Sequence, residues 1–240
     1  MKKLRKTVIL SMVLMLSCMS VTAENLKEKA TATDSVAVNI KDNSKTIDGH
    51  RFIDLALPSG LLWAETNVGA ETAADVGCYF AWGETKTKAT YTWKKYELGK
   101  LAKQKKYNAK DGHTKLLAED DAASTNWGSY CRMPTNAEFA ELGDSLNCTW
   151  TFCDTTQTDG STMAGIKVTS KRNGRSIFLP ATGYRDKFEH RVGSDGLYWS
   201  SSVDCPEYRN AWCACATWYG FESNNTERCT GMAVRPVAEP

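Results

Sequence analysis

The feature that most constrains the fold is the order of the secondary-structure signals along the chain. The C-terminal half is crowded with segments that have the apolar patterns of strands, at 166–169, 177–179, 198–202, 211–219 and 232–235. Asn173-Gly174 predicts a hairpin turn of the primed type, and Pro236 is expected to end the last strand. Because helices precede these strands and do not alternate with them, the order predicts an α+β domain, not a parallel α/β sheet.

The N-terminal half carries fewer signals. Three further strands are expected at 51–57, 61–64 and 78–82, and a short helix is expected over 121–127. Thr135 followed by Glu138 forms a capping box for a second helix. The apolar stripe that this helix turns to the core consists of Phe139, Leu142 and Leu146. The helix is expected to end by Leu146.

Residues 1–23 predict an export signal. Four cations precede an apolar run that is too short to cross a bilayer, and small residues end at Ala23. Leu16-Ser17-Cys18 also resembles a lipoprotein cleavage box, so that acylation of Cys18 would tether the chain to a membrane surface. Both alternatives predict an exported protein, in the periplasm, on the outer-membrane surface or secreted. No later segment is apolar over enough residues to be transmembrane.

Residues 24–48 read as a flexible polar leader, and one domain is expected over 49–238. Loss of the four cations of residues 1–23 changes the formal charge from +2 to −2, which argues against a nucleic-acid partner. Residues 84–120 differ from the rest, with ten lysines against five acidic residues. This segment is either a solvated excursion or a basic arm that binds a ligand.

Eight cysteines follow residue 23, namely Cys78, Cys131, Cys148, Cys153, Cys205, Cys213, Cys215 and Cys229. An even number in an exported chain predicts disulfides. Cys213 and Cys215 lie two apart in an expected strand, so they share a face and do not bridge each other easily. The spacing Cys-Ala-Cys is tighter than that of zinc ligands, and the three histidines lie far away in sequence. We therefore expect no metal cofactor at these cysteines.

Several segments, kept in order, resemble a known family. They are HRFIDLALPSGLLWAETNVGA (50–70), YFAWGET (79–85), KYNAKDGHTKL (106–116), EDDAASTNWGSYCRMPTNAEFAEL (119–142), IKVTSKRNGRSIFLPATGYR (166–185), YWSSS (198–202) and GMAVRPV (231–237). This set resembles the Fibrobacter succinogenes major paralogous domain of exported Bacteroidetes proteins, and its last segments resemble the C-type-lectin-like fold.

The resemblance implies a compact domain of two short helices and a twisted antiparallel sheet, with its ends close together. The chain departs from the family at Glu65-Thr66, where Thr-Cys is usual, and at Cys131, where a Trp is common. By analogy with lectin-like folds, Cys131 would pair with Cys229 and Cys205 with Cys213. The same fold occurs in formylglycine-generating oxidases.

The candidate ligand-binding residues are of two kinds. In the expected strand 211–219, Trp212 and Trp218 share a face with two alanines, a trough on which a sugar ring could stack, although such residues more often pack in a core. The loop 203–210, with Glu207, Tyr208 and Arg209, falls near the position where lectin-like folds place their binding loops.

An oxygen-rich cluster is a weak calcium candidate and consists of Asp111, Glu119, Asp120 and Asp121. The competing interpretation, which we favour, is that Asp120 or Asp121 caps a short helix. The sequence contains no nucleophile elbow and no metalloprotease helix. We therefore expect a non-catalytic, cofactor-free binding or adhesion module that recognises a glycan or a protein. A structural surface protein and an enzyme related to the oxidases are the alternatives.

Overall fold

The computed structural model describes residues 44–240, which belong to one compact unit, Asp42–Pro240. The expected export signal, the Cys18 anchor and most of the leader lie outside the described residues. Strand β1 (Lys45–Ile47) falls inside the segment expected to be leader, so the ordered domain begins earlier than predicted. No helix within residues 44–240 has the length and apolarity needed to cross a membrane.

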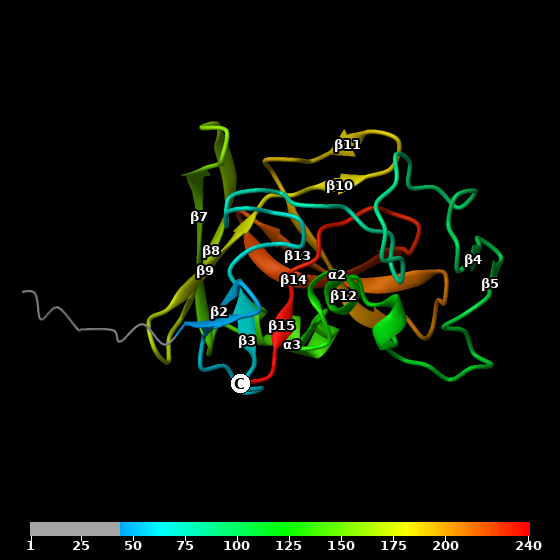
Figure 1. Cartoon of the computed structure of the whole chain (residues 1–240), viewed down its shortest axis with the longest axis horizontal. Coiled ribbons are helices and arrows are strands. Elements are labelled where there is room, and N and C mark those ends of the chain that lie inside the picture. Colours follow the sequence, from blue (N-terminus) through cyan, green and yellow to red (C-terminus); the bar gives the residue numbers. More distant parts are fainter. Residues whose placement is uncertain (1–43) are drawn as a thin grey trace, which may run out of the picture. The chain divides into compact units, whose positions relative to one another are not determined.

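The first sheet joins the two ends of the described chain (Figure 1). Its order is β1-β2-β3-β15-β6, and its further strands are β2 (His50–Asp54), β3 (Leu62–Ala64), β6 (Cys131–Arg132) and β15 (Val237–Ala238). The C-terminal strand β15 lies between β3 and β6 and is antiparallel to both. The early and late parts of the domain therefore depend on each other for their pairing.

Two three-stranded antiparallel sheets make up most of the second half. One has the order β7-β8-β9, formed by Cys148–Thr156, Thr162–Ser170 and Ser176–Pro180. The other has the order β12-β13-β14, formed by Gly196–Val203, Asn210–Thr217 and Gly220–Glu227. Two small hairpins complete the set, β4–β5 (Gly99–Lys100 and Lys103–Gln104) and β10–β11 (Tyr184–Arg185 and Glu189–His190).

The helices follow the sequence signals. A 3₁₀ helix, η1 (Ala118–Asp120), precedes α2 (Ala122–Trp127). Helix α3 (Asn136–Gly143) begins with the predicted capping box: the Glu138 amide donates to the Thr135 hydroxyl, and the Thr135 amide donates to the Glu138 carboxylate. Two α-helices against mostly antiparallel sheet within residues 44–240 confirm the α+β class.

Strand β13 forms the boundary between the two main apolar clusters. Ala214 and Ala216 pack into the cluster that contains Trp63 and Phe139, while Cys213 and Cys215 pack into the cluster on the other side. Both faces of β13 are therefore buried, although a strand of an antiparallel sheet often exposes one face.

Three strand predictions need correction. Residues 78–82 form no strand and make one isolated bridge, from Phe80 to Met232. The last strand follows Pro236 instead of ending at it, because 232–235 contribute only isolated bridges and β15 starts at Val237. The turn at Asn173-Gly174 is longer than a two-residue primed turn, since the β8–β9 ladder closes at Ser170 and Arg175.

Arg235 is the buried charge that ties these sheets together. Its side chain is 0% exposed. Nε donates to Oδ1 of Asn67 at 2.8 Å, and Nη1 donates to the carbonyls of Ala64 and Glu65 at 3.0 and 2.6 Å. Nη2 donates to the carbonyl of Phe178 in β9 at 3.0 Å. One guanidinium thus joins the end of β3 to the β7–β9 sheet.

Replacing Arg235 is expected to destabilise the whole domain. Arg235→Met retains the apolar stem but leaves several buried carbonyl oxygens without donors, at a cost of about 1–3 kcal/mol for each group that water cannot reach. We expect the free energy of unfolding, measured by urea denaturation, to fall by about 3 kcal/mol or more. Arg172→Met, at an exposed arginine, is the control and should change it by less than about 0.5 kcal/mol. Equal stability of the two variants would contradict this role.

Candidate functional site

An open groove of about 770 Å³ lies between two segments that are far apart in the sequence. One wall is the β4–β5 hairpin and the turn after it, residues 101–111, and the other is the β12–β13 loop, residues 206–209. The second wall contains the three predicted loop residues, Glu207, Tyr208 and Arg209. The first belongs to the segment for which a basic binding arm was one of two interpretations. The structure therefore brings two independently suspected segments together.

Arg228 holds the two walls of the groove in place. Its side chain is fully buried. The guanidinium donates to the carbonyls of Lys106 and Tyr107 on one side, at 3.2 and 2.6 Å, and to the carbonyl of Asn210 on the other, at 3.3 Å. The backbone amide of Arg228 also donates to the carbonyl of Arg209 at 3.1 Å. Nothing in the local sequence pattern identified this residue.

The environment of Arg228 keeps its charge in one position. The guanidinium carbon lies 4.6 Å from the centre of the Trp82 ring, which is a cation–π contact. Burial lowers the pKa of Arg228, while Tyr96 and Asp111 oppose this shift. Because the ordinary pKa of arginine lies far above neutrality, the group stays charged and continues to donate.

Tyr107 adopts a left-handed backbone conformation, with φ of 59°, between the lining residues Lys105 and Asn108 of the first wall. Such a conformation costs of order 1–3 kcal/mol in a residue other than glycine, so it needs compensation. Oδ2 of Asp111 accepts the Tyr107 amide at 2.6 Å, Arg228 donates to its carbonyl, and its hydroxyl bonds Asp120. Hydrogen bonds to the amide, the carbonyl and the side chain of Tyr107 therefore fix the turn that shapes this wall.

The groove carries an excess of positive charge. Lys103, Lys105, Lys110 and Arg209 line it, against two carboxylates. Both carboxylates have protein partners: Glu207 lies 3.5 Å from Arg209, and Asp111 accepts backbone amides. Burial raises the pKa of Asp111, but hydrogen bonds from the amides of residues 113, 108 and 107 outweigh it and lower the pKa overall. Asp111 is therefore held in its ionised form, and both carboxylates have partners within the protein.

The lysine side chains of the groove make few bonds to the protein. Nζ of Lys105 donates to the carbonyl of Glu97 at 2.9 Å. Within residues 44–240, Lys103 and Lys110 make no ion pair and no side-chain hydrogen bond. These two ammonium groups remain available to a ligand.

No protein-family model matches the chain, and neither a curated protein nor a solved structure matches it. The chemistry of this site must therefore be argued from its own residues.

The predicted Trp–Ala–Ala–Trp trough does not form. Ala214 and Ala216 are buried in the core beneath β13, and Trp212 is half-buried. Strand β13 ends at Thr217, so Trp218 lies in the hairpin turn, where it is 75% exposed. Its neighbour Tyr219 is 65% exposed, and the two rings meet edge to face with their centroids 5.3 Å apart. The exposed aromatics are thus a pair at a hairpin tip.

The four calcium candidates have separate tasks. Asp111 orders the turn described above, while Glu119 and Asp120 both pair with Nζ of Lys106. Asp121 caps α2 by accepting the amides of Ala123 and Ser124, which confirms the capping interpretation. In the described part of the chain, no three or more His, Cys, Asp or Glu side chains are arranged to hold a metal ion.

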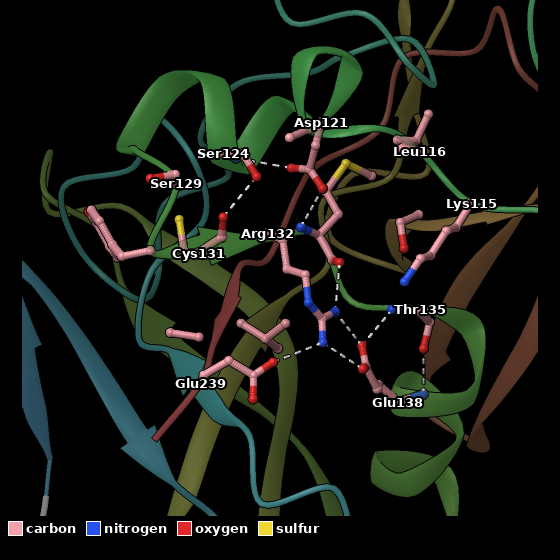
Figure 2. A pocket seen from close by; sticks show the side chains of 16 residues that line it. Lys115, Leu116, Asp121, Ser124, Ser129, Cys131, Arg132, Thr135, Glu138 and Glu239 are labelled. Carbon is pink, nitrogen blue, oxygen red and sulfur yellow. Dashed lines mark hydrogen bonds and ion pairs between the residues drawn. The ribbon is translucent and has the colours of Figure 1, made fainter. Parts of the chain in front are cut away.

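A smaller cavity of about 280 Å³ lies among α2, β6, α3 and β15 (Figure 2). Its polar side chains bond mainly to the protein: Asp121 also accepts the amide of Met133 at 2.8 Å, and Arg132 makes two 2.8 Å bonds to Glu138. Glu239 lies 3.6 Å from Arg132. These contacts join the C-terminal segment to the start of α3, so we assign this cavity a structural role and treat the groove as the candidate site.

The predicted disulfides are wrong for this structure, in which all eight described cysteines are free. Cys131 and Cys229 belong to different apolar clusters. In the β12–β13 ladder, Cys213 lies opposite Trp199. Cys205 lies beyond the outermost pair, which Val203 forms, so a bridge across this hairpin would be out of register.

Loss of the Arg228 clamp is expected to loosen the groove before the rest of the domain. Arg228→Lys keeps a charge but replaces three nitrogen atoms in a planar fork by a single one, which does not reproduce the spacing of the bonds to the two walls. We expect faster hydrogen–deuterium exchange in residues 99–111 and 204–210, with smaller changes in β7–β9. Arg209→Lys, the same type of replacement at an exposed side chain that makes no bond between the walls, is the matched control. Uniform acceleration of exchange across the domain would contradict a local clamp.

The thiols should separate into two groups by reactivity. Burial raises the pKa of Cys131, Cys213 and Cys229 to about 12 and of Cys148 and Cys215 to about 11, so these thiols stay protonated at neutral pH. Iodoacetamide is expected to modify the half-buried Cys78, Cys153 and Cys205 first. Mass spectrometry of native and urea-unfolded protein measures this order. Peptides linking Cys131 to Cys229, found without reduction, would contradict it.

Proposed function

We propose that residues 44–240 form a non-catalytic recognition module that binds an anionic, extended ligand, such as an acidic glycan, in the groove. The observation that carries this is a groove lined by four cations from two separate segments and by two carboxylates, in which Arg209 pairs with Glu207 and backbone amides bond Asp111, so that the charge of the three lysines is left uncompensated. Two of these cations are unpaired within the described chain. Carboxylate or sulfate groups on a saccharide would give them partners.

The shape of the groove supports a polymer more than a small metabolite. It is open, and its walls come from two exposed loops, with Tyr208 and Leu101 as its large apolar side chains. A pocket for a small molecule would bury most of its ligand, whereas an open groove fits a chain that passes through it. Tyr208 is half-buried against the core, so its ring is a fixed wall.

A recognition role also agrees with the sequence resemblance. We include in the proposal that the domain has the lectin-like fold of the major paralogous domain family and acts outside the cytoplasm. Five of the eight described cysteines are buried, so the oxidase alternative would have to use the half-buried Cys78, Cys153 or Cys205.

The exposed pair Trp218 and Tyr219 favours one second candidate. Aromatic rings on a hairpin tip can stack on the apolar face of a neutral sugar, without help from charge. The two sites predict different responses to salt, since binding through the ammonium groups of the groove weakens with salt and stacking on the aromatic pair does not.

The groove is tested with the double variant Lys103→Ala/Lys110→Ala. Each lost ion pair is worth at most about 1 kcal/mol at an exposed site, so we expect the affinity for oligogalacturonate or chondroitin sulfate to fall by roughly tenfold. Isothermal titration calorimetry at two salt concentrations measures it, with dextran as the neutral probe. Lys45→Ala/Lys167→Ala removes two exposed lysines elsewhere and is the matched control.

Three outcomes decide between the alternatives. Binding that weakens with salt and with the groove variant supports the proposal. Salt-independent binding of dextran that disappears on Trp218→Ala moves the site to the hairpin tip. Failure of every saccharide to bind, together with the thermal stability of an intact fold, favours a structural surface protein and overturns the proposal.

A further inference from the structure

Strands β7 and β8 are the two longest strands among residues 44–240, and β7 lies at the edge of its sheet (Figure 1). It pairs with β8 along its whole length, from Cys148 opposite Ser170 to Thr156 opposite Thr162, with no shift of register. No described strand pairs with its other edge.

The hydrogen bonds of β8 reveal which groups of β7 face outward. In an antiparallel sheet, successive residues of a strand turn their amide and carbonyl to alternate neighbours. The amide of Ala181 donates to the carbonyl of Ala164, and that of Ser170 donates to the carbonyl of Arg175, so even-numbered residues of β8 face β9. Odd-numbered residues of β8 therefore face β7.

The same alternation applies to β7. The register places odd-numbered residues of β7 opposite odd-numbered residues of β8, for example Cys153 opposite Gly165. The bond from the Lys171 amide to the Asn147 carbonyl continues this pattern beyond the strand. The amides and carbonyls of Trp150, Phe152 and Asp154 therefore point away from β8. None of them bonds to another backbone group in the described chain.

This edge lacks the features that normally prevent strand pairing. Exposed edges are usually short, bulged, or protected by lysine or proline. β7 has nine residues, no bulge, no proline and no cation, and its single charge is Asp154. Phe152 is 38% exposed at the middle of the strand. An open and nearly uncharged edge of this length fits another extended strand.

We propose that β7 pairs with β7 of a second copy of this chain, antiparallel and centred on Phe152. The strand is complementary to itself in this register. All nine residues overlap, and Phe152 faces Phe152 of the second copy. The outward amides and carbonyls of Trp150, Phe152 and Asp154 gain partners, while the Cys148 amide keeps its bond to the carbonyl of Asp144. Asp154 faces Trp150 of the second copy, so no like charges are opposed. The two β7–β9 sheets become one continuous sheet.

The register also predicts which residue of the second copy lies opposite Cys153. Thr151 lies opposite Cys153 of the second copy, and Thr149 lies opposite its Thr155. Because odd-numbered residues form the pairs without mutual hydrogen bonds, their side chains are the closer ones across the interface. A thiol at position 151 is therefore within disulfide reach of Cys153, whereas one at position 149 is not.

Charge at the centre of the interface tests the pairing. We expect the full chain to sediment as a dimer, and Phe152→Lys and Phe152→Glu each to sediment as monomers, since like charges then oppose each other at the two-fold axis. An equimolar mixture of the two variants should recover the dimer, which also shows that both variants fold. A monomeric wild type, or variants that remain dimeric, would overturn the proposal.

Cross-linking tests the register. Thr151→Cys should give a covalent dimer on a non-reducing gel after mild oxidation, and Thr151→Cys/Cys153→Ser should not. Thr149→Cys is the control on the same face and edge, and it should stay monomeric under these conditions. A covalent dimer from Thr149→Cys but none from Thr151→Cys would overturn the register centred on Phe152.

Discussion

The domain depends on two arginines whose guanidinium groups are buried and bonded mainly to backbone carbonyls. Arg235 joins the end of β3 to β9, and Arg228 joins the two walls of the groove. Three of the carbonyls they bond belong to irregular backbone, at Glu65, Lys106 and Tyr107, and the other three lie in strands, at Ala64, Phe178 and Asn210. A planar group with five donors can satisfy several such oxygens at once, which no apolar side chain can do. Long connections can then cross the domain without leaving unpaired polar groups inside it.

The candidate site follows from this arrangement. Residues 84–120 contain little regular structure, with only the β4–β5 hairpin and a 3₁₀ turn. Their aromatic side chains nevertheless bury: Tyr91, Tyr96 and Tyr107 are each at most 2% exposed. The segment is therefore an anchored loop whose lysines remain on the outside. A fixed backbone with free ammonium groups is suited to recognition, because little ordering is required when a ligand binds.

The sequence predicted the elements whose signals are local. The Thr135 capping box, the Asp121 cap and the apolar strands β8, β9 and β12 need only neighbouring residues to be recognised. It did not predict β7 and β14, because edge strands with exposed faces carry no apolar alternation. The predicted tryptophan trough does not form because β13 is buried on both faces. The predicted Cys205–Cys213 pair does not form because the register of the β12–β13 ladder places Cys213 opposite Trp199. A loop over 203–210 was predicted, but its position opposite residues 101–111 and the role of Arg228 depend on tertiary contacts that no local pattern reveals.

The placement of β1 and β2 relative to the groove has a mechanical consequence. Figure 1 shows these strands toward one end of the domain and the β4–β5 hairpin at the other. Whatever precedes Lys45 pulls on the domain from the β1 end, through a strand held edgewise by β2. A load applied between that attachment and a ligand in the groove would run across the domain, from β1 toward the β4–β5 hairpin. Such a load would first shear β1 from β2, leaving the two arginine clamps to yield later.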